Sequence, residues 1–548
     1  MEFTSDPHSP NAIAERTRYV YMHIVDWIIF TVLTSGLLLS GWVIKKYMRS
    51  VADFVVLNRR MRTFLGLSTW SVEGIGLVSI VYLTEQGFTS GFGYLWMTLL
   101  NSAIYLPVFG IIGFGIQRFR ATRVQTIPQY HEMRFSKGVR VTSGISLAVG
   151  GILNMAIFPA VSSHFLVLYM GLPATFDFLG VTVTTETATM VLLVCVSAFM
   201  AILGGMVTMV VTDYIQYVLL TLSMFLTVAL SVWAVGLGQV DRVLTERYGD
   251  AAFNPFVVSA GGEGYGITWV LFFLLSGLLA PLCFPPSTSK LSATDSPETT
   301  RRLALLGNVM NIGRNVMLLI WGACALAFVA HSSPSAPFSA TEARYATASF
   351  LHAVTPVGIL GICACGMVCA YVSTDNGYYL SWSAIIVNDI VTPLWGQPLS
   401  PRVHLKLLRC AIACVAAFLI AWSLVYEPQE SILEYIYLSG TVFTSAGIIT
   451  FFGLYWRRAT SAAAYLTAFI CLAIPLSDIF GKWWFASYPL KGHQSGLLAI
   501  TLSMIGFLVI GFFSKAGEAK WRDFGKVLRM GAPDVTISGS RHERAGDK

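Results

Sequence analysis

Long apolar stretches separated by short polar loops run through almost the whole chain. About thirteen of them are near or above the ~20 residues that a helix needs to cross a bilayer. They span roughly residues 24–44, 65–90, 94–116, 142–168, 181–203, 206–236, 267–286, 303–330, 357–386, 405–425, 431–454, 460–477 and 494–514. The pattern therefore predicts an all-α integral membrane protein with about 13 transmembrane helices.

The composition supports a membrane protein. Hydrophobic residues make up 55% of the 548 residues and charged residues only 12%, a balance that is not typical of soluble domains. The formal charge of +7 lies in short loops and the tail rather than in a basic recognition segment. We therefore expect the lipid bilayer as a partner and no nucleic acid.

The distribution of Lys and Arg predicts the orientation. One set of alternate loops, with the tail from residue 515, holds 28 of the 36 basic residues, and the other side holds 7, with Arg314 inside a span. The positive-inside rule then predicts an outside N-terminus and a cytoplasmic C-terminus. Residues 1–22 have no basic n-region with a cleavage site, so we expect no cleaved signal peptide and a multi-pass protein of the cell inner (plasma) membrane.

No pattern indicates enzyme chemistry. The nine cysteines all fall in apolar segments, without metal-ligand or disulfide-framework spacing. The histidines are scattered, with no HxxxH or HExxH set inside a span. We therefore expect a protein that is not an enzyme.

The span at 357–386 carries an unusual cluster of polar side chains: Ser373, Thr374, Asp375, Asn376, Ser381 and Ser383. An acid at the bilayer centre costs about 2.5 to 3.5 kcal/mol, so this cluster should face protein, water or an ion. Hydroxyls beside a carboxylate are hard oxygen donors that suit a small cation. Alternatively, Ser373 and Thr374 only bond back to carbonyls of the preceding turn.

Two spans show signs of being broken. Gly74 and Gly76 lie in the middle of the span at 65–90, beside Glu73, and glycine costs a helix about 1 kcal/mol per position. Unwound backbone would free carbonyls that a cation can satisfy, although close helix packing is the alternative. The span at 267–286 has a similar interruption at Ser276, Gly277, Pro281, Pro285 and Pro286. Two broken helices five spans apart are typical of an inverted-repeat transporter.

Two motifs carry a family resemblance. GGxxxxxxTDxxQ begins at Gly204, and AxxSTDxxxxxSxSxxxxxDI follows about 160 residues later, from Ala370. Together they resemble the solute:sodium symporter family, which includes sodium-coupled transporters of proline, pantothenate, sialic acid and sugars. The resemblance covers roughly residues 24–514. It implies sodium-coupled symport of a small organic solute by alternating access, with no cofactor beyond Na+.

The resemblance also implies a LeuT-like fold with a 5+5 inverted repeat, one leading helix and two trailing helices. The expected divisions are an outside N-terminus and leading helix (1–64), a first five-helix repeat (65–236), a second inverted repeat (267–454), two trailing helices (455–514) and a cytoplasmic tail (515–548).

A sodium site between the first and eighth core helices follows from the same resemblance. The implied ligands are the carbonyls of Gly74, Leu77 and Ala370 and the hydroxyls of Ser373 and Thr374. Asp213 matches a position that, in some members, helps to hold a further sodium or lies on the inward exit path. The hydroxyls that accompany it in those members are replaced here by Asn376 and Gly377, which puts that second site in doubt. Asp375 is the candidate to supply a carboxylate in place of those hydroxyls.

The solute is expected to bind at mid-membrane between the broken helices. Positions that roughly align with the family's cavity argue against a sugar-like polyol: Gly76, Val81, Leu100, Gly277, Ala280 and Leu433. Asn311 and Arg314 share a face of the seventh core helix, and a guanidinium is a bidentate partner for a carboxylate. We therefore expect a small carboxylate-bearing solute, with candidate contacts at Gly76, Ser79, Gly277, Asn311 and Arg314.

Three alternatives stay open at this point. Arg314 could pair internally with Glu73, Glu434 or Asp213. The solute could be neutral or sugar-like. The chain could be a transporter-like membrane sensor, although the tail from Lys515 is too short for a catalytic module.

Overall fold

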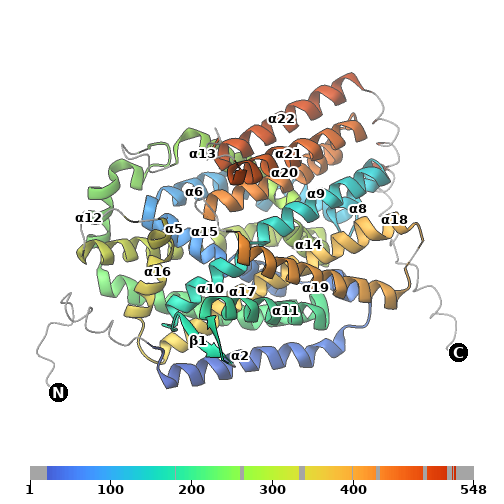
Figure 1. Cartoon of the computed structure of the whole chain (residues 1–548). Helices are drawn as coiled ribbons and strands as arrows, with labels where there is room; N and C mark the ends of the chain where they lie inside the picture. Colours follow the sequence, from blue (N-terminus) through green and yellow to red (C-terminus); the bar gives the residue numbers. More distant parts are fainter. Residues whose placement is uncertain are drawn as a thin grey trace, which may run out of the picture.

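The computed structural model is almost entirely helical (Figure 1). It describes residues 21–178, 180–258, 265–332, 338, 340–397, 399–426, 432–484 and 490–514, with 517, 521, 524 and 525 of the tail. Within these ranges, the departure from an all-α protein is a short antiparallel hairpin in which Thr175 pairs with Thr184.

The first half of the chain contains the leading helix and the elements up to residue 252. These are α2 (Ile24–Ile44), η1 (Lys45–Tyr47), α3 (Val51–Val56), η2 (Leu57–Arg59), α4 (Thr63–Glu73), α5 (Leu77–Ser90), α6 (Gly93–Tyr105), η3 (Leu106–Ile111), α7 (Ile116–Ala121), α8 (Ile127–Arg134), α9 (Lys137–Met155), α10 (Phe158–Tyr169), β1 (Thr175–Phe178), β2 (Val181–Thr184), α11 (Thr185–Val235), α12 (Leu237–Tyr248) and η4 (Gly249–Ala252).

The second half contains α13 (Gly266–Cys283), α14 (Pro285–Ala293), α15 (Pro297–Ser332), α16 (Ala340–Val354), α17 (Ile359–Ala384), η5 (Ile385–Val391), α18 (Thr392–Trp395), α19 (Pro401–Val425), α20 (Ile432–Tyr455), α21 (Ser461–Trp484) and α22 (Gly492–Phe513). Helix α17 lies in the middle of the bundle, and nearly all of its side chains are buried.

The number of membrane crossings is not settled by helix length. Eleven helices in the described ranges are long and apolar enough to span a bilayer, or twelve if the bent pair α4 and α5 is one span. Helix α11 has 51 residues, which at 1.5 Å per residue is about 76 Å, more than twice a ~30 Å hydrocarbon core. The thirteen predicted spans therefore require α11 to count as two, and the total stays a prediction.

Gly205 divides α11 at the boundary that the sequence predicted. Its backbone is non-helical, with φ 55° and ψ −142°, a conformation that favours glycine. Ser197 before the break and Asp213 after it both contact α17, at Asp375 and Ser373 respectively. Because both halves reach the same short stretch of α17, the chain turns back at Gly205.

The first predicted helix break is present, and the second lies at the C-terminal end of the stretch that the sequence predicted, at Pro285 and Pro286. Helices α4 and α5 meet at a 60° bend. Helix α13 continues through Ser276, Gly277 and Pro281 and ends at Cys283, with Phe284 as the cap before the proline that starts α14. The Ser276 hydroxyl bonds back to Phe272 O at 2.7 Å, which is compatible with an intact helix.

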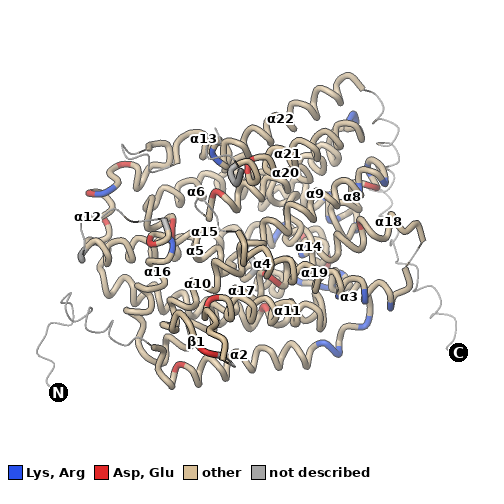
Figure 2. Tube along the Cα trace, in the orientation of Figure 1, with Lys and Arg blue, Asp and Glu red and all other residues tan. Residues whose placement is uncertain are grey.

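The surface of the bundle fits a membrane protein. Large apolar side chains are exposed on α2, α11 and α22, among them Trp42, Phe225 and Phe513, as expected where a surface faces lipid. Lys and Arg gather at the end of the bundle that holds α3, α8 and α18 (Figure 2). This grouping is compatible with the predicted orientation, which stays a prediction.

Candidate functional site

The helix break lies against the polar cluster of α17. Gly74 ends α4, its N–H bonding to Trp70 O at 3.2 Å, and α5 starts after Gly76, whose backbone is extended at φ −70° and ψ 160°. Interrupting the helix leaves backbone carbonyls without the partners of a continuous ladder. A β-carbon placed at Gly76 would lie 2.9 Å from Thr374 Oγ1. The close approach of the two segments therefore depends on glycine.

Ser373 is oriented by Asp213 of α11. Its hydroxyl donates to Asp213 Oδ1 at 2.7 Å, and both side chains are fully buried. A hydroxyl that donates its proton still has lone pairs with which it can accept or coordinate. Ala370 is also fully buried, one turn earlier on α17.

This donor set fits a small monovalent cation. Hydroxyls from α17, a carboxylate from α11 and the freed carbonyls at the helix break are all oxygen ligands. The structure thus places Thr374 beside the break and Ser373 beside Asp213, while Leu77 is buried at the first position of α5.

Asp375 and Asn376 have different surroundings. Asp375 Oδ2 accepts from Ser197 Oγ at a long 3.5 Å, and its Oδ1 has no hydrogen-bond partner in the described part of the chain. The oxygen of the buried Asn376 amide likewise lacks a described partner. Asp213, on the second half of α11, thus meets α17 at Ser373, whereas Asp375 of α17 meets the first half of α11 at Ser197. Ser373 and Asp375 are two positions apart and lie on different faces of α17.

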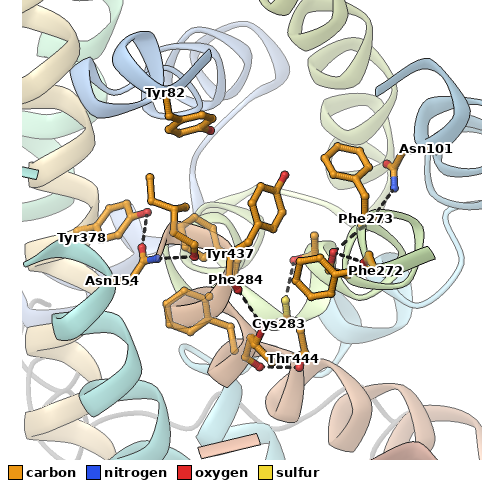
Figure 3. A pocket seen from close by; sticks show the side chains of 17 residues that line it. Tyr82, Asn101, Asn154, Phe272, Phe273, Cys283, Phe284, Tyr378, Tyr437 and Thr444 are labelled. Atoms are coloured by element: carbon orange, nitrogen blue, oxygen red, sulfur yellow. Dashed lines mark hydrogen bonds between the residues drawn. The ribbon is translucent and has the colours of Figure 1, made fainter. Parts of the chain in front are cut away.

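A central cavity of about 260 Å³ opens between six elements, α5, α6, α9, α13, α17 and α20 (Figure 3). Its size is close to the lower end of typical small-molecule sites. The polar residues that line it are Tyr82, Asn101, Asn154, Ser276, Tyr378, Tyr437, Thr441 and Thr444. Four phenylalanines complete the wall: Phe272, Phe273, Phe284 and Phe443. None of the described lining residues is charged.

Asn154 is the most firmly fixed polar group of this cavity. Its amide nitrogen donates to Ile436 O at 3.0 Å and to Ser439 Oγ at 2.9 Å, and Tyr378 OH donates to its oxygen at 3.5 Å. Asn101, by contrast, makes a single long bond within the described residues, from its amide nitrogen to Phe273 O at 3.5 Å. The cavity thus combines one rigid amide with one that can turn toward a solute.

The residues proposed from the sequence as solute contacts do not gather in one place. Gly277 lines the central cavity, where its ideal β-carbon would lie 1.8 Å from the Asn101 nitrogen. Gly76 lies at the helix break, and Ser79 and Asn311 are not among the residues that line either cavity. Arg314 lines a second cavity.

The rough alignment behind the polyol argument was off by one residue at two positions. Tyr82 and Asn101 line the central cavity, not Val81 and Leu100. A shift of one residue turns a side chain by about 100° around a helix. The lining of amides and hydroxyls is therefore compatible with a polyol solute. The available signal was the polar residues themselves, set within apolar spans.

The second cavity, also about 260 Å³, lies between α4, α11 and α15. Its lining residues are Ser71, Val72, Tyr217, Leu220, Thr221, Met224, Phe225, Met310, Gly313, Arg314 and Met317. The Arg314 Nη2 atom lies 3.3 Å from the ideal β-carbon position of Gly74.

The suggested internal partners of Arg314 have other contacts. Glu434 accepts hydrogen bonds from Trp269 Nε1 and from His493, and Asp213 accepts from Ser373. The side chain of Glu73 lies outside the described residues. Arg314 Nε is buried without a hydrogen-bond partner in the described structure.

Comparisons with known proteins agree on the class of protein. The family model of the sodium:solute symporter family matches residues 54–471. A sodium/glucose cotransporter of Vibrio parahaemolyticus is 24% identical over 522 residues, which cover 89% of this chain and 90% of that protein. The outward-open structure of a Na+-coupled sialic acid symporter matches with a TM-score of 0.73 and 18% identity, over 89% of this chain and 98% of that one. This structural match confirms the predicted LeuT-like fold.

Proposed function

Because this chain belongs to the sodium:solute symporter family, we propose that it is a sodium-coupled symporter that imports a small organic solute by alternating access. The sodium ion binds at the α4–α5 break against α17, and the solute binds in the central cavity. The proposed location is the cell inner membrane, with the N-terminus outside and the C-terminus cytoplasmic.

The observation that carries the sodium site is the contact between the helix break and Thr374. The proposed ligands are the carbonyls of Gly74, Leu77 and Ala370 and the hydroxyls of Ser373 and Thr374. Asp213 accepts a hydrogen bond from the Ser373 hydroxyl, so the lone pairs of that hydroxyl oxygen are free to face the ion. A carboxylate in this position also increases the electron density on the hydroxyl oxygen, as outer-shell acids do for other ligands.

A second cation, if one is coupled, belongs at Asp213 in this proposal. Asp213 adjoins a proposed sodium ligand, so it can share an ion or guide one toward the cytoplasm. Asp375 and Asn376 are weaker candidates because Asp375 contacts Ser197, away from the Ser373 face.

The solute is proposed to be small, uncharged and able to form hydrogen bonds. This follows from a lining of amides, hydroxyls and phenylalanine rings without a charged group among the described residues. The relative named as a sodium/glucose cotransporter keeps sugars among the candidates. A carboxylate-bearing solute, which Arg314 suggested, would need its acid group held by Arg314, and Arg314 lines the other cavity.

One sodium ion is enough to drive such a solute. A charge crossing 100 mV releases about 2.3 kcal/mol, and a tenfold sodium gradient adds about 1.4 kcal/mol. The sum supports a roughly several-hundred-fold gradient of a neutral solute. A monoanion would cancel the electrical part and would need a second cation.

The test is uptake into proteoliposomes under a sodium gradient, using pairs of solutes that differ only by a primary amide or a carboxylate, together with a panel of sugars. We expect uptake of an uncharged solute that stops when sodium is replaced by choline. Uptake that persists at full rate without sodium would refute the coupling. Uptake confined to the carboxylate member of a pair would overturn the proposed solute class and leave the coupling intact.

A further inference from the structure

The cavity between α4, α11 and α15, called here the Arg314 cavity, has no part in the proposed solute path. Its walls are mostly apolar: Val72, Leu220, Met224, Phe225, Met310 and Met317. Arg314 is the charged member among its described lining residues. The cavity therefore combines one positive charge with a methionine-rich surface that adapts readily to apolar ligands.

Arg314 lacks an anion in the described structure. Its Nε is buried without an acceptor, and the described acids suggested as partners, Glu434 and Asp213, have the contacts given above. An unpaired charge in a low-dielectric environment is strongly unfavourable. The cavity thus offers an anion a guanidinium whose Nε is buried and whose charge has no counter-ion in the described structure.

The entrance of the Arg314 cavity lies on the outside of the bundle. Phe225 lines the cavity and is 57% exposed, and Gly313 of α15 is exposed as well. Val218 and Leu222, on the same α11 segment, also have exposed side chains. Because this surface is apolar, a ligand would enter from the bilayer.

We propose that the Arg314 cavity binds an alkyl carboxylate from the bilayer, with its acid group on Arg314 and its chain against the methionines. A volume of about 260 Å³ holds eight or nine chemical groups if each occupies ~30 Å³, the volume per molecule in liquid water. Octanoate is therefore a probe of suitable size. A guanidinium binds a carboxylate with two parallel hydrogen bonds, which an alcohol cannot reproduce.

Binding of this anion regulates sodium affinity, an effect that rests on the sodium site proposed above. The Arg314 guanidinium lies next to Gly74, whose carbonyl is a proposed ligand, so its positive charge weakens the binding of sodium. An anion on Arg314 offsets that charge. By linkage, octanoate tightens sodium binding and sodium tightens octanoate binding by the same factor.

The site itself is tested by thermal unfolding of the purified full-length protein with octanoate or octanol. Octanoate should raise the melting temperature saturably, and octanol should not. Arg314→Gln should abolish the shift, whereas Arg302→Gln should keep it. Arg302 is a matched control because it lies on the same helix, exposed and paired with Glu298.

The coupling is tested by measuring sodium affinity with and without saturating octanoate. We expect at least a threefold tighter sodium Kd in the wild type, no effect of octanoate in Arg314→Gln, and tighter sodium binding by that variant alone. If octanoate raises the melting temperature through Arg314 but sodium affinity does not change, the coupling is overturned and the octanoate site still stands. Failure to bind sodium at all would refute the sodium site, while the octanoate shift would still test the cavity.

One outcome would overturn the whole inference. If octanoate has no effect, and Glu73→Gln lowers the melting temperature as much as Arg314→Gln does, then Arg314 is paired within the chain and the cavity needs no anion.

Discussion

The two cavities of this transporter have the same volume, about 260 Å³, and opposite chemistry. The central cavity is lined by amides, hydroxyls and aromatic rings from six elements, with no charged side chain among the described residues. The Arg314 cavity has one arginine and mostly apolar walls. The difference teaches that a conspicuous intramembrane charge does not have to mark the transported solute.

The two cavities are connected through the broken helix. Gly74, at the end of α4, lies beside Arg314, and Tyr82 of α5 lines the central cavity. The proposed sodium ion lies at the break between them. Substitutions at these three places should therefore have effects of different kind and size.

The largest effect is expected from Thr374→Ala, which removes the hydroxyl beside the break. Hydrogen bonds and ligands to charged groups contribute about 1.5 to 3 kcal/mol, so the sodium concentration for half-maximal uptake should rise about 10- to 100-fold. Ser383→Ala is the control, because the Ser383 hydroxyl of the same helix bonds back to Leu380 O within the helix. An unchanged sodium dependence in Thr374→Ala would remove this residue from the site.

Asp213→Asn and Asp375→Asn separate the two acidic candidates. Asp213 accepts a 2.7 Å bond from Ser373, whereas Asp375 has a 3.5 Å contact with Ser197. Loss of the charge-assisted bond at Asp213 should raise the half-saturating sodium concentration about tenfold, and Asp375→Asn should change it less than about twofold. A larger effect at Asp375 in sodium-dependent uptake would reverse the assignment.

Asn154→Ala tests the central cavity. It removes the amide that Ile436 and Ser439 hold in place, so the KM for the solute should rise about five- to tenfold, equivalent to about 1 kcal/mol. Sodium binding measured without solute should stay the same. A normal KM would show that the solute binds elsewhere.

Gly277→Ala should have a smaller effect through Asn101. The added methyl would lie 1.8 Å from the Asn101 nitrogen, so the amide must turn away, and a KM increase of about threefold is expected from weakening one neutral hydrogen bond. Gly440 lines the same cavity but has no heavy atom closer than 3.9 Å to its ideal β-carbon. Gly440→Ala should therefore transport normally, and equal defects in both variants would mean that cavity volume, not Asn101, is decisive.

The smallest effect on solute KM is expected from Arg314→Gln, less than about twofold for an uncharged solute. Its effect should instead be seen in sodium affinity. A KM increase of about 100-fold, the loss expected when a buried bidentate partner of a carboxylate is removed, would restore the carboxylate solute and place it on Arg314. Uptake assays over a range of solute concentrations decide between these outcomes.

The fold was predictable from the sequence because its signals are local. Apolar length marks the spans, the glycines at 74 and 76 mark the first break, and Gly205 lies at the predicted division of α11. The predicted interruption of the span at 267–286 was too wide, because a serine can bond within an intact helix and an internal proline can be tolerated. Only the proline that starts a new helix, Pro285, coincides with the interruption.

The candidate site was predictable only in part, because its contacts join distant segments. Residue types indicated an oxygen-rich cluster on α17, but nothing local shows that Ser373 meets Asp213 or that Thr374 fits against Gly76. The central cavity depends on the rotation of six elements about their axes. An error of one residue, as between Leu100 and Asn101, exchanges a leucine for an amide.

The burial of α17 around almost its whole circumference has a mechanical consequence. A helix that is packed on every side cannot tilt without displacing its neighbours. We therefore expect α17 to stay in place during transport while the bent pair α4–α5 moves against it. A covalent clamp between α17 and α11 should then leave the cycle running. The same covalent link between α17 and α5 should stop transport, with the central cavity closed permanently to one side of the membrane.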